Sequence, residues 1–181
     1  YNSGSDIIDV GGESTRPMSK EIKLKDEWKR IKTTLKKLQR KKIPVSLDTR
    51  KSSIMQKGIK LGIKLINDIS GLKFDTQSIN IIKKNDIPFI IHHIQGNPLT
   101  MQKNPRYKNI LLDIYDYFEE RIKFIRLNGI KHKNIIIDPG IGFGKNLKHN
   151  ITLLSKISLF HSLGFPILIG ASRKRFIEHI V

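Results

Sequence analysis

The sequence predicts an α/β fold, an incomplete TIM-type (β/α)₈ barrel. Short β-branched runs alternate with helical patterns along the chain, which indicates right-handed βαβ units and a parallel sheet. Nearly every predicted strand ends in polar residues. This favours a barrel over an open doubly wound sheet, because the loops of a barrel converge on one site. A complete barrel needs about 250 residues, whereas this chain has 181. We therefore expect one partial domain over residues 1–181, with about six of the eight barrel strands.

Six segments have the composition of short buried strands. Strands that are covered on both faces lose the alternation of half-exposed ones and become continuous apolar runs. The six segments are residues 6–10, 44–47, 65–66, 89–91, 135–137 and 166–170.

Helical spacing fills the connections between these strands. Apolar residues recur at intervals of three and four in three stretches, namely Trp28, Ile31, Leu35 and Leu38; then Leu111, Ile114, Phe118, Ile122 and Ile125; then Leu154, Ile157 and Phe160. Weaker helices are expected near residues 52–61 and 76–85, with Ser52 and Thr76 as their N-caps.

Composition excludes several classes of function. The chain has no cysteine, which excludes disulfides and zinc–sulfur sites, and it lacks a signal-like segment, so we expect a cytoplasmic protein. No apolar run approaches the ~20 residues that cross a bilayer, and we expect no membrane partner. The net charge is +18. Since the lysines lie mostly on solvent faces of helices without interleaved aromatic residues, we expect no nucleic-acid partner and read the charge as compatible with a small anionic substrate.

The most informative stretch is residues 138–146, Asp-Pro-Gly-Ile-Gly-Phe-Gly-Lys-Asn, directly after a predicted strand. It places the Asp138 carboxylate at the mouth of the barrel. The glycines at every second position allow a flat ligand to approach the backbone closely. This pattern predicts a binding site.

Six motifs together resemble those of the dihydropteroate synthase family of pterin-binding enzymes. They lie, in the family's order, at residues 6–17, 46–49, 66–69, 93–98, 138–146 and 170–174. The resemblance implies a (β/α)₈ barrel transferase of folate biosynthesis and a target of sulfonamides. It would join 7,8-dihydropterin-6-ylmethyl diphosphate to p-aminobenzoate and release diphosphate. A Mg²⁺ cofactor and a homodimer are also implied.

The resemblance assigns roles residue by residue. A buried carboxylate can accept two hydrogen bonds from the guanidine-like edge of a pterin, and the residues implied to bind the pterin are Asp48, Asn67, Asp138, Gly142 and Lys174. Those implied to contact p-aminobenzoate or the anion are Thr15, Arg16, Pro17, Phe143 and Arg175. The catalytic set is Asp48, Asp138, Lys174 and Arg16.

The chain departs from the family pattern in three ways. Some members carry Ser where this chain has Arg175, and the usual Met-His-Met reads His92-His93-Ile94. Adjacent histidines on a strand point to opposite faces, so we expect no shared metal ligation and a core or supporting place for His92. The family's first strand, with its metal-binding Asn, and its final strand, with the Arg and His for diphosphate, have no counterpart here. No metal ligand is therefore expected in these residues.

Two alternatives remain open at this stage. One is a corrinoid-dependent methyltetrahydrofolate methyltransferase, which shares the pterin-binding barrel but not the Glu-Ser-Thr-Arg-Pro and Ser-Arg-Lys motifs. The other is a non-catalytic basic binding module.

Overall fold

The computed structural model describes residues 4–174 and 176–177. Within them, five strands form one parallel sheet in chain order, namely β1 (Ile8–Gly11), β2 (Val45–Asp48), β3 (Leu65–Asp68), β4 (Phe89–His92) and β5 (Ile135–Asp138). Each strand pairs with the next one along the chain. A doubly wound sheet would reverse its strand order at a switch point. The described residues therefore have the sequential winding that a barrel requires.

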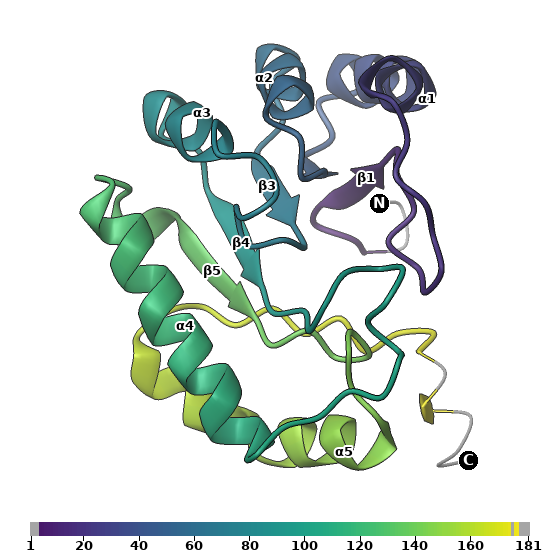
Figure 1. Cartoon of the computed structure of the whole chain (residues 1–181). Coiled ribbons are helices and arrows are strands. Elements are labelled where there is room, and N and C mark those ends of the chain that lie inside the picture. The colour runs from purple at the N-terminus through teal and green to yellow at the C-terminus, as the bar shows by residue number, and fades with distance from the viewer. Residues whose placement is uncertain (1–3, 175, 178–181) are drawn as a thin grey trace.

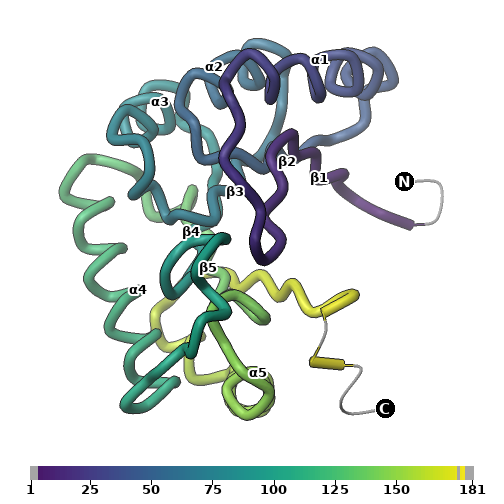
Figure 2. Tube along the Cα trace, turned by 45° about the vertical axis from the view of Figure 1, so that its right-hand side comes forward, coloured from purple at the N-terminus to yellow at the C-terminus, as the bar shows by residue number. Residues whose placement is uncertain are grey.

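Helices connect the strands and lie outside the curved sheet (Figures 1 and 2). The α-helices are α1 (Leu24–Arg40), α2 (Ser52–Lys60), α3 (Ser78–Asn85), α4 (Ile110–Leu127) and α5 (Leu147–Ser155). Two short 3₁₀ segments, η1 (His132–Asn134) and η2 (Ile157–Leu163), precede β5 and follow α5. Because the strands are parallel, the loops that follow their carboxyl ends lie together at one edge of the sheet.

The predicted helical stripes form the core. Ile31 and Leu35 of α1 are buried, as are Ile114 and Phe118 of α4, and all four belong to the main apolar cluster. Burying one side chain of this kind contributes about 1.5–3 kcal/mol. These stripes fix the helices on the sheet and so fix where the strand ends lie.

The predicted sixth strand, residues 166–170, is wrong as an extended strand. This segment runs beside β5 and makes a single parallel bridge, Ile137 to Ile167. Two hydrogen bonds support the bridge, from the N–H of Ile137 to the carbonyl of Pro166 at 3.0 Å and from the N–H of Leu168 to the carbonyl of Ile137 at 2.8 Å. No described strand pairs with its other edge, and Ile169 is half-exposed.

The helix ends also differ from the prediction. Ser52 is the first residue of α2 and not its cap, and its N–H donates instead to Asp75 Oδ2 at 2.9 Å. Helix α3 begins at Ser78, two residues after the predicted cap Thr76. The last predicted helix is interrupted at Lys156, where α5 gives way to η2. Caps depend on which side chain reaches a free N–H in space, which spacing along the chain does not reveal.

Candidate active site

The polar ends of the strands meet at one edge of the sheet. The parallel register pairs Gly11 with Asp48, Asp48 with Asn67, and His92 with Asp138. Because each of these residues lies at or beside the end of its strand, the edge presents a row of polar side chains. The sequence predicted this convergence.

Asp138, the last residue of β5, is the buried acid of this edge, with 4% of its surface exposed. Its Oδ1 accepts a hydrogen bond from the N–H of Gly140 at 2.7 Å, while Oδ2 lies 3.7 Å from His92 Nε2. Among the described residues nothing donates a hydrogen bond to Oδ2. Burial raises the pKa of Asp138 to about 6, against the opposing charges of Lys145 and Lys174. The group is a desolvated carboxyl with one oxygen free for a ligand.

Lys174 lies close enough to this carboxyl for their charges to interact, and its stem packs on the glycine loop. Its Nζ lies 4.1 Å from the centroid of the Phe143 ring. A Cβ at Gly142 would come within 3.0 Å of Lys174 Cδ, so a glycine there leaves room for the lysine stem. Burial lowers the pKa of Lys174, and the charge of Asp138 acts against this. The structure thus brings together four predicted site residues, Asp138, Gly142, Phe143 and Lys174.

His92 lies at the same place and not in a remote core. Its ring is buried and meets Phe143 edge-on, with the centroids 4.4 Å apart. Burial, helped by the charges of Lys145 and Lys174, keeps the pKa of His92 well below its usual range. His92 Nδ1 has no hydrogen-bond partner in the part of the chain that the structure describes.

His93 has different neighbours from His92, as the alternation of a strand requires. It packs against Tyr117, with the ring centroids 4.9 Å apart. The buried ammonium of Lys145 lies 2.9 Å from His93 Nδ1 and donates to the carbonyl of Phe143 at 2.9 Å. Burial lowers the pKa of Lys145 to about 7. Lys145 therefore fastens the glycine loop to the end of β4, a contact that the sequence analysis did not predict.

Asp48 and Asn67 form a second part of the edge, on β2 and β3. Burial raises the pKa of Asp48 well above its usual range, and the nearby charge of Asp9 adds to this effect. Asn67 Oδ1 is buried and has no partner among the described residues, which leaves an open acceptor. Asp9 was missed by the sequence analysis. The signal for it was an acid between the apolar Ile8 and Val10 of a strand.

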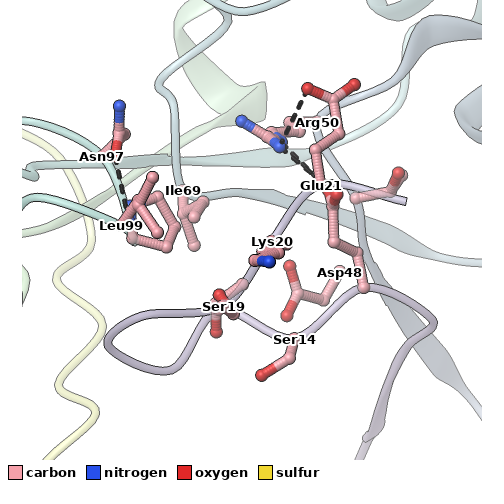
Figure 3. A pocket seen from close by; sticks show the side chains of 13 residues that line it. Ser14, Ser19, Lys20, Glu21, Asp48, Arg50, Ile69, Asn97 and Leu99 are labelled. Atoms are coloured by element: carbon pink, nitrogen blue, oxygen red, sulfur yellow. Dashed lines mark hydrogen bonds and ion pairs between the residues drawn. The ribbon is translucent and has the colours of Figure 1, made fainter. Parts of the chain in front are cut away.

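A cavity of about 240 Å³ opens between the loop after β1 and the loop after β4 (Figure 3). Thr15 and Asp48 both line it, together with Arg50 and Lys20. Arg16 and Pro17, predicted for the same role as Thr15, are exposed on the same loop and do not line the cavity. Arg175, the remaining predicted contact, lies outside the described residues.

A largely buried ionic network adjoins this cavity, and the sequence analysis did not predict it. Lys51 Nζ contacts Glu13 Oε1 at 3.2 Å and Glu27 Oε2 at 2.8 Å. Arg50 Nε donates to Glu13 Oε2 at 3.0 Å. Of these four residues, Glu13 alone sits inside one of the recognised motifs, and each of these contacts joins positions more than 20 residues apart.

No metal centre is formed by the side chains that the structure describes. Among residues 4–174 and 176–177, no group of three or more His, Cys, Asp or Glu side chains could hold a metal ion. Within the same residues, no helix is long and apolar enough to cross a membrane.

Comparisons with known proteins agree with this geometry. The dihydropteroate synthase of Escherichia coli (strain K12) is 38% identical over 181 residues, which cover 99% of this chain and 64% of that protein. The crystal structure of the Yersinia pestis dihydropteroate synthase with a sulfonamide drug complex superposes with a TM-score of 0.95 at 34% identity, covering 99% of this chain and 65% of that one. The Xanthomonas albilineans dihydropteroate synthase with 4-aminobenzoic acid gives a TM-score of 0.92 at 30% identity, covering 99% and 63%.

The chain thus spans somewhat less than two thirds of the length of these relatives. The family model "Pterin binding enzyme" matches residues 1–181. The matched residues form a parallel sheet whose strands follow chain order, with a buried acid at the end of β5. The chain belongs to the family of pterin-binding enzymes.

Proposed function

We propose that the protein containing these residues is a dihydropteroate synthase, which joins 7,8-dihydropterin-6-ylmethyl diphosphate to p-aminobenzoate and releases diphosphate. The observation that carries the proposal is the buried carboxylate of Asp138, whose Oδ2 faces the site without a hydrogen bond from the described residues. A flat ligand with adjacent N–H donors satisfies such a group. An unpaired buried carboxylate would otherwise be costly.

The residues around Asp138 match the rest of a reduced pterin. Asn67 offers an acceptor at Oδ1 and an amide donor. Lys174 can donate to the ring carbonyl and to N5. Gly142 leaves room for the stem of Lys174, and Phe143 provides an aromatic wall for p-aminobenzoate. These proposed roles combine the sequence-based assignment with the surroundings that each side chain has in the structure.

Catalysis proceeds by bond breaking first. The C–O bond between the methylene and the diphosphate breaks, and the electron pair leaves with the diphosphate oxygen. The carboxylates of Asp48 and Asp138 favour the pterin cation that remains. The amine nitrogen of p-aminobenzoate then bonds to the methylene and loses a proton to water. Because an aromatic amine is already unprotonated at neutral pH, no side chain has to act as a strong base.

The loop after β1 serves the anionic groups in this scheme. The hydroxyl of Thr15 lines the cavity beside Asp48, and the guanidinium of Arg16 extends from the same loop. Both can contact the departing diphosphate or the p-aminobenzoate carboxylate. The proposed enzyme acts as a homodimer.

An assay of diphosphate release by the full-length protein tests the proposal. We expect release that requires both the dihydropterin diphosphate and p-aminobenzoate. Methyl transfer from methyltetrahydrofolate to a corrinoid, without diphosphate release, would overturn it in favour of a methyltransferase. A salt-dependent shift on duplex DNA in a protein that lacks both activities would favour a basic binding module.

A further inference from the structure

The loop of residues 14–21, which follows β1, is closed at its base. Glu13 precedes the loop, and its Oε1 accepts a hydrogen bond from the N–H of Ile22 at 3.0 Å. Lys51 Nζ donates to the carbonyl of Ile22 at 2.7 Å and to Glu13 Oε1 at 3.2 Å. The two residues that flank the loop are therefore joined to each other and to one ammonium group.

All the donors of Lys51 are occupied. An ammonium group has three N–H donors, and the third contact is with Glu27 Oε2 at 2.8 Å. Only 4% of the surface of Lys51 is exposed. Lys51 thus has no donor left for a substrate, and any effect on the reaction must pass through the loop.

The network around Lys51 balances its charges. Arg50 also binds Glu13, so two cations face the two carboxylates of Glu13 and Glu27. Glu27 is fully buried and also accepts a hydrogen bond from the Thr49 hydroxyl at 2.5 Å. Buried charges are tolerated only when each has its partners in good geometry. This requirement gives the base of the loop one well-defined arrangement.

The tip of the loop is held at a second point. The N–H of Met18 donates to the carbonyl of Pro98, in the loop after β4, at 2.9 Å. Thr15 lies between the fixed base and this fixed tip and lines the cavity opposite Asn97 and Leu99. The loop cannot move away from the cavity while both ties hold.

We propose that Lys51 is a positioning residue, which holds the loop of residues 14–21 so that Thr15 lines the cavity beside Asp48 and Arg16 extends from the same loop. This inference rests on the proposed function in one respect, namely that Thr15 and Arg16 serve p-aminobenzoate and the diphosphate. Pterin recognition by Asp138 depends on β5 and the glycine loop and should not require Lys51.

The test uses Lys51→Met in the full-length protein, with Lys60→Met as its control. Lys60 is exposed at the last residue of α2, the helix that Lys51 precedes as its N-cap residue. Trypsin reports on the loop directly, because the Lys20–Glu21 bond lies within it. We expect cleavage after Lys20 to be about tenfold faster in Lys51→Met. We also expect kcat/KM for p-aminobenzoate to fall about tenfold or more because the loop is misplaced. The Kd for the dihydropterin should stay within about twofold.

Removal of Lys51 alone leaves the buried Glu27 without its cation. If Lys51→Met does not fold, Lys51→Met/Glu27→Gln and Glu13→Gln take its place with the same readouts. Unchanged cleavage and unchanged p-aminobenzoate kinetics in a folded variant would overturn the proposal. So would faster cleavage with unaltered kinetics, or a loss of pterin affinity as large as the loss in kcat/KM. Because the trypsin assay needs no substrate, it still decides whether Lys51 holds the loop if the protein proves to have no synthase activity.

Discussion

His92 Nε2 lies 3.7 Å from Asp138 Oδ2, and the two residues face each other in register at the ends of β4 and β5. This distance is too long for a hydrogen bond. The other ring nitrogen, Nδ1, is buried without a partner in the part of the chain that the structure describes. His92 thus brings two polar atoms into the site and obtains no direct hydrogen bond there from the described residues.

We expect His92→Met to stabilise the full-length protein. Methionine removes a buried polar atom that lacks a partner, and such an atom costs about 1–3 kcal/mol. Urea unfolding should show a gain of about 1 kcal/mol in the free energy of unfolding. A loss of stability would mean that water or another group satisfies Nδ1.

Asp138→Asn should abolish dihydropterin binding. The variant keeps the shape of the side chain but removes the charge that two pterin N–H groups would meet, at a cost of about 1.5–3 kcal/mol or more. Isothermal titration calorimetry measures the loss, with Asp116→Asn on the exposed face of α4 as the control. Equal affinity in the two variants would contradict the role given to Asp138.

Pterin affinity should fall as the pH is lowered through about 6. Burial raises the pKa of Asp138 from its usual 3.8 to about 6, and only the ionised carboxylate accepts both hydrogen bonds. From pH 7 to pH 5 the Kd should rise about tenfold, and Asp138→Asn should lack this dependence. The raised pKa of Asp138 also affects folding, where the protonated carboxyl and not the carboxylate is the favoured form. Since the folded state binds the proton more tightly than the unfolded chain, Asp138 lowers stability as the pH rises from about 3.8 to about 6.

Arg16→Ala should impair turnover and the use of p-aminobenzoate more than pterin binding. The side chain is exposed on the loop after β1, whereas Asp138 lies at the end of β5. Loss of one charged contact costs about 1.5–3 kcal/mol, which steady-state kinetics with Arg40→Ala as control would detect. A fall in pterin affinity as large as that of Asp138→Asn would show that the two residues do not divide the work in this way.

Gly140→Ala should destabilise the protein more than Gly62→Ala. Both glycines have positive φ, +72° and +81°, but a Cβ at Gly140 would overlap the carbonyl oxygen of His93, whereas one at Gly62 meets nothing within 4 Å. Each variant incurs the left-handed strain of about 1–2 kcal/mol, and Gly140→Ala adds about 1–3 kcal/mol of overpacking. Equal urea midpoints for the two variants would show that the backbone after β4 shifts easily to make room for the added Cβ.

The sequence was informative where local pattern decides the structure. Apolar runs located β1 to β5, and the spacing of Ile114 and Phe118 located the buried face of α4, because burial and periodicity are properties of neighbouring residues. The same reasoning failed for residues 166–170, which make only a single bridge to β5. An apolar run does not show over how many residues it will pair with its neighbour.

The candidate site was likewise predictable from local motifs but not in its contacts between residues that are distant in sequence. Motif positions placed Asp138 and Lys174 near each other, which the charge coupling between them supports. The ties of Lys51 to Glu13 and of Lys145 to the end of β4 were not predicted, since they join residues that are distant in sequence. Arg16 and Pro17 were placed with Thr15 by motif alone. The path of the loop brings Thr15 to the cavity and leaves Arg16 and Pro17 exposed, and motif positions do not reveal that path.

The strand order of the sheet has a consequence for folding. Each strand pairs with the strand made just before it, from β1 to β5, so the sheet can grow by one βα unit at a time as the chain leaves the ribosome. Asp48 and Asn67 reach their final neighbours early in this sequence. Asp138 follows much later, and Lys174 later still. A nascent chain therefore aligns Asp48 and Asn67 well before Asp138 and Lys174 are present to complete the pterin site, and pterin binding can stabilise only the last stage of folding.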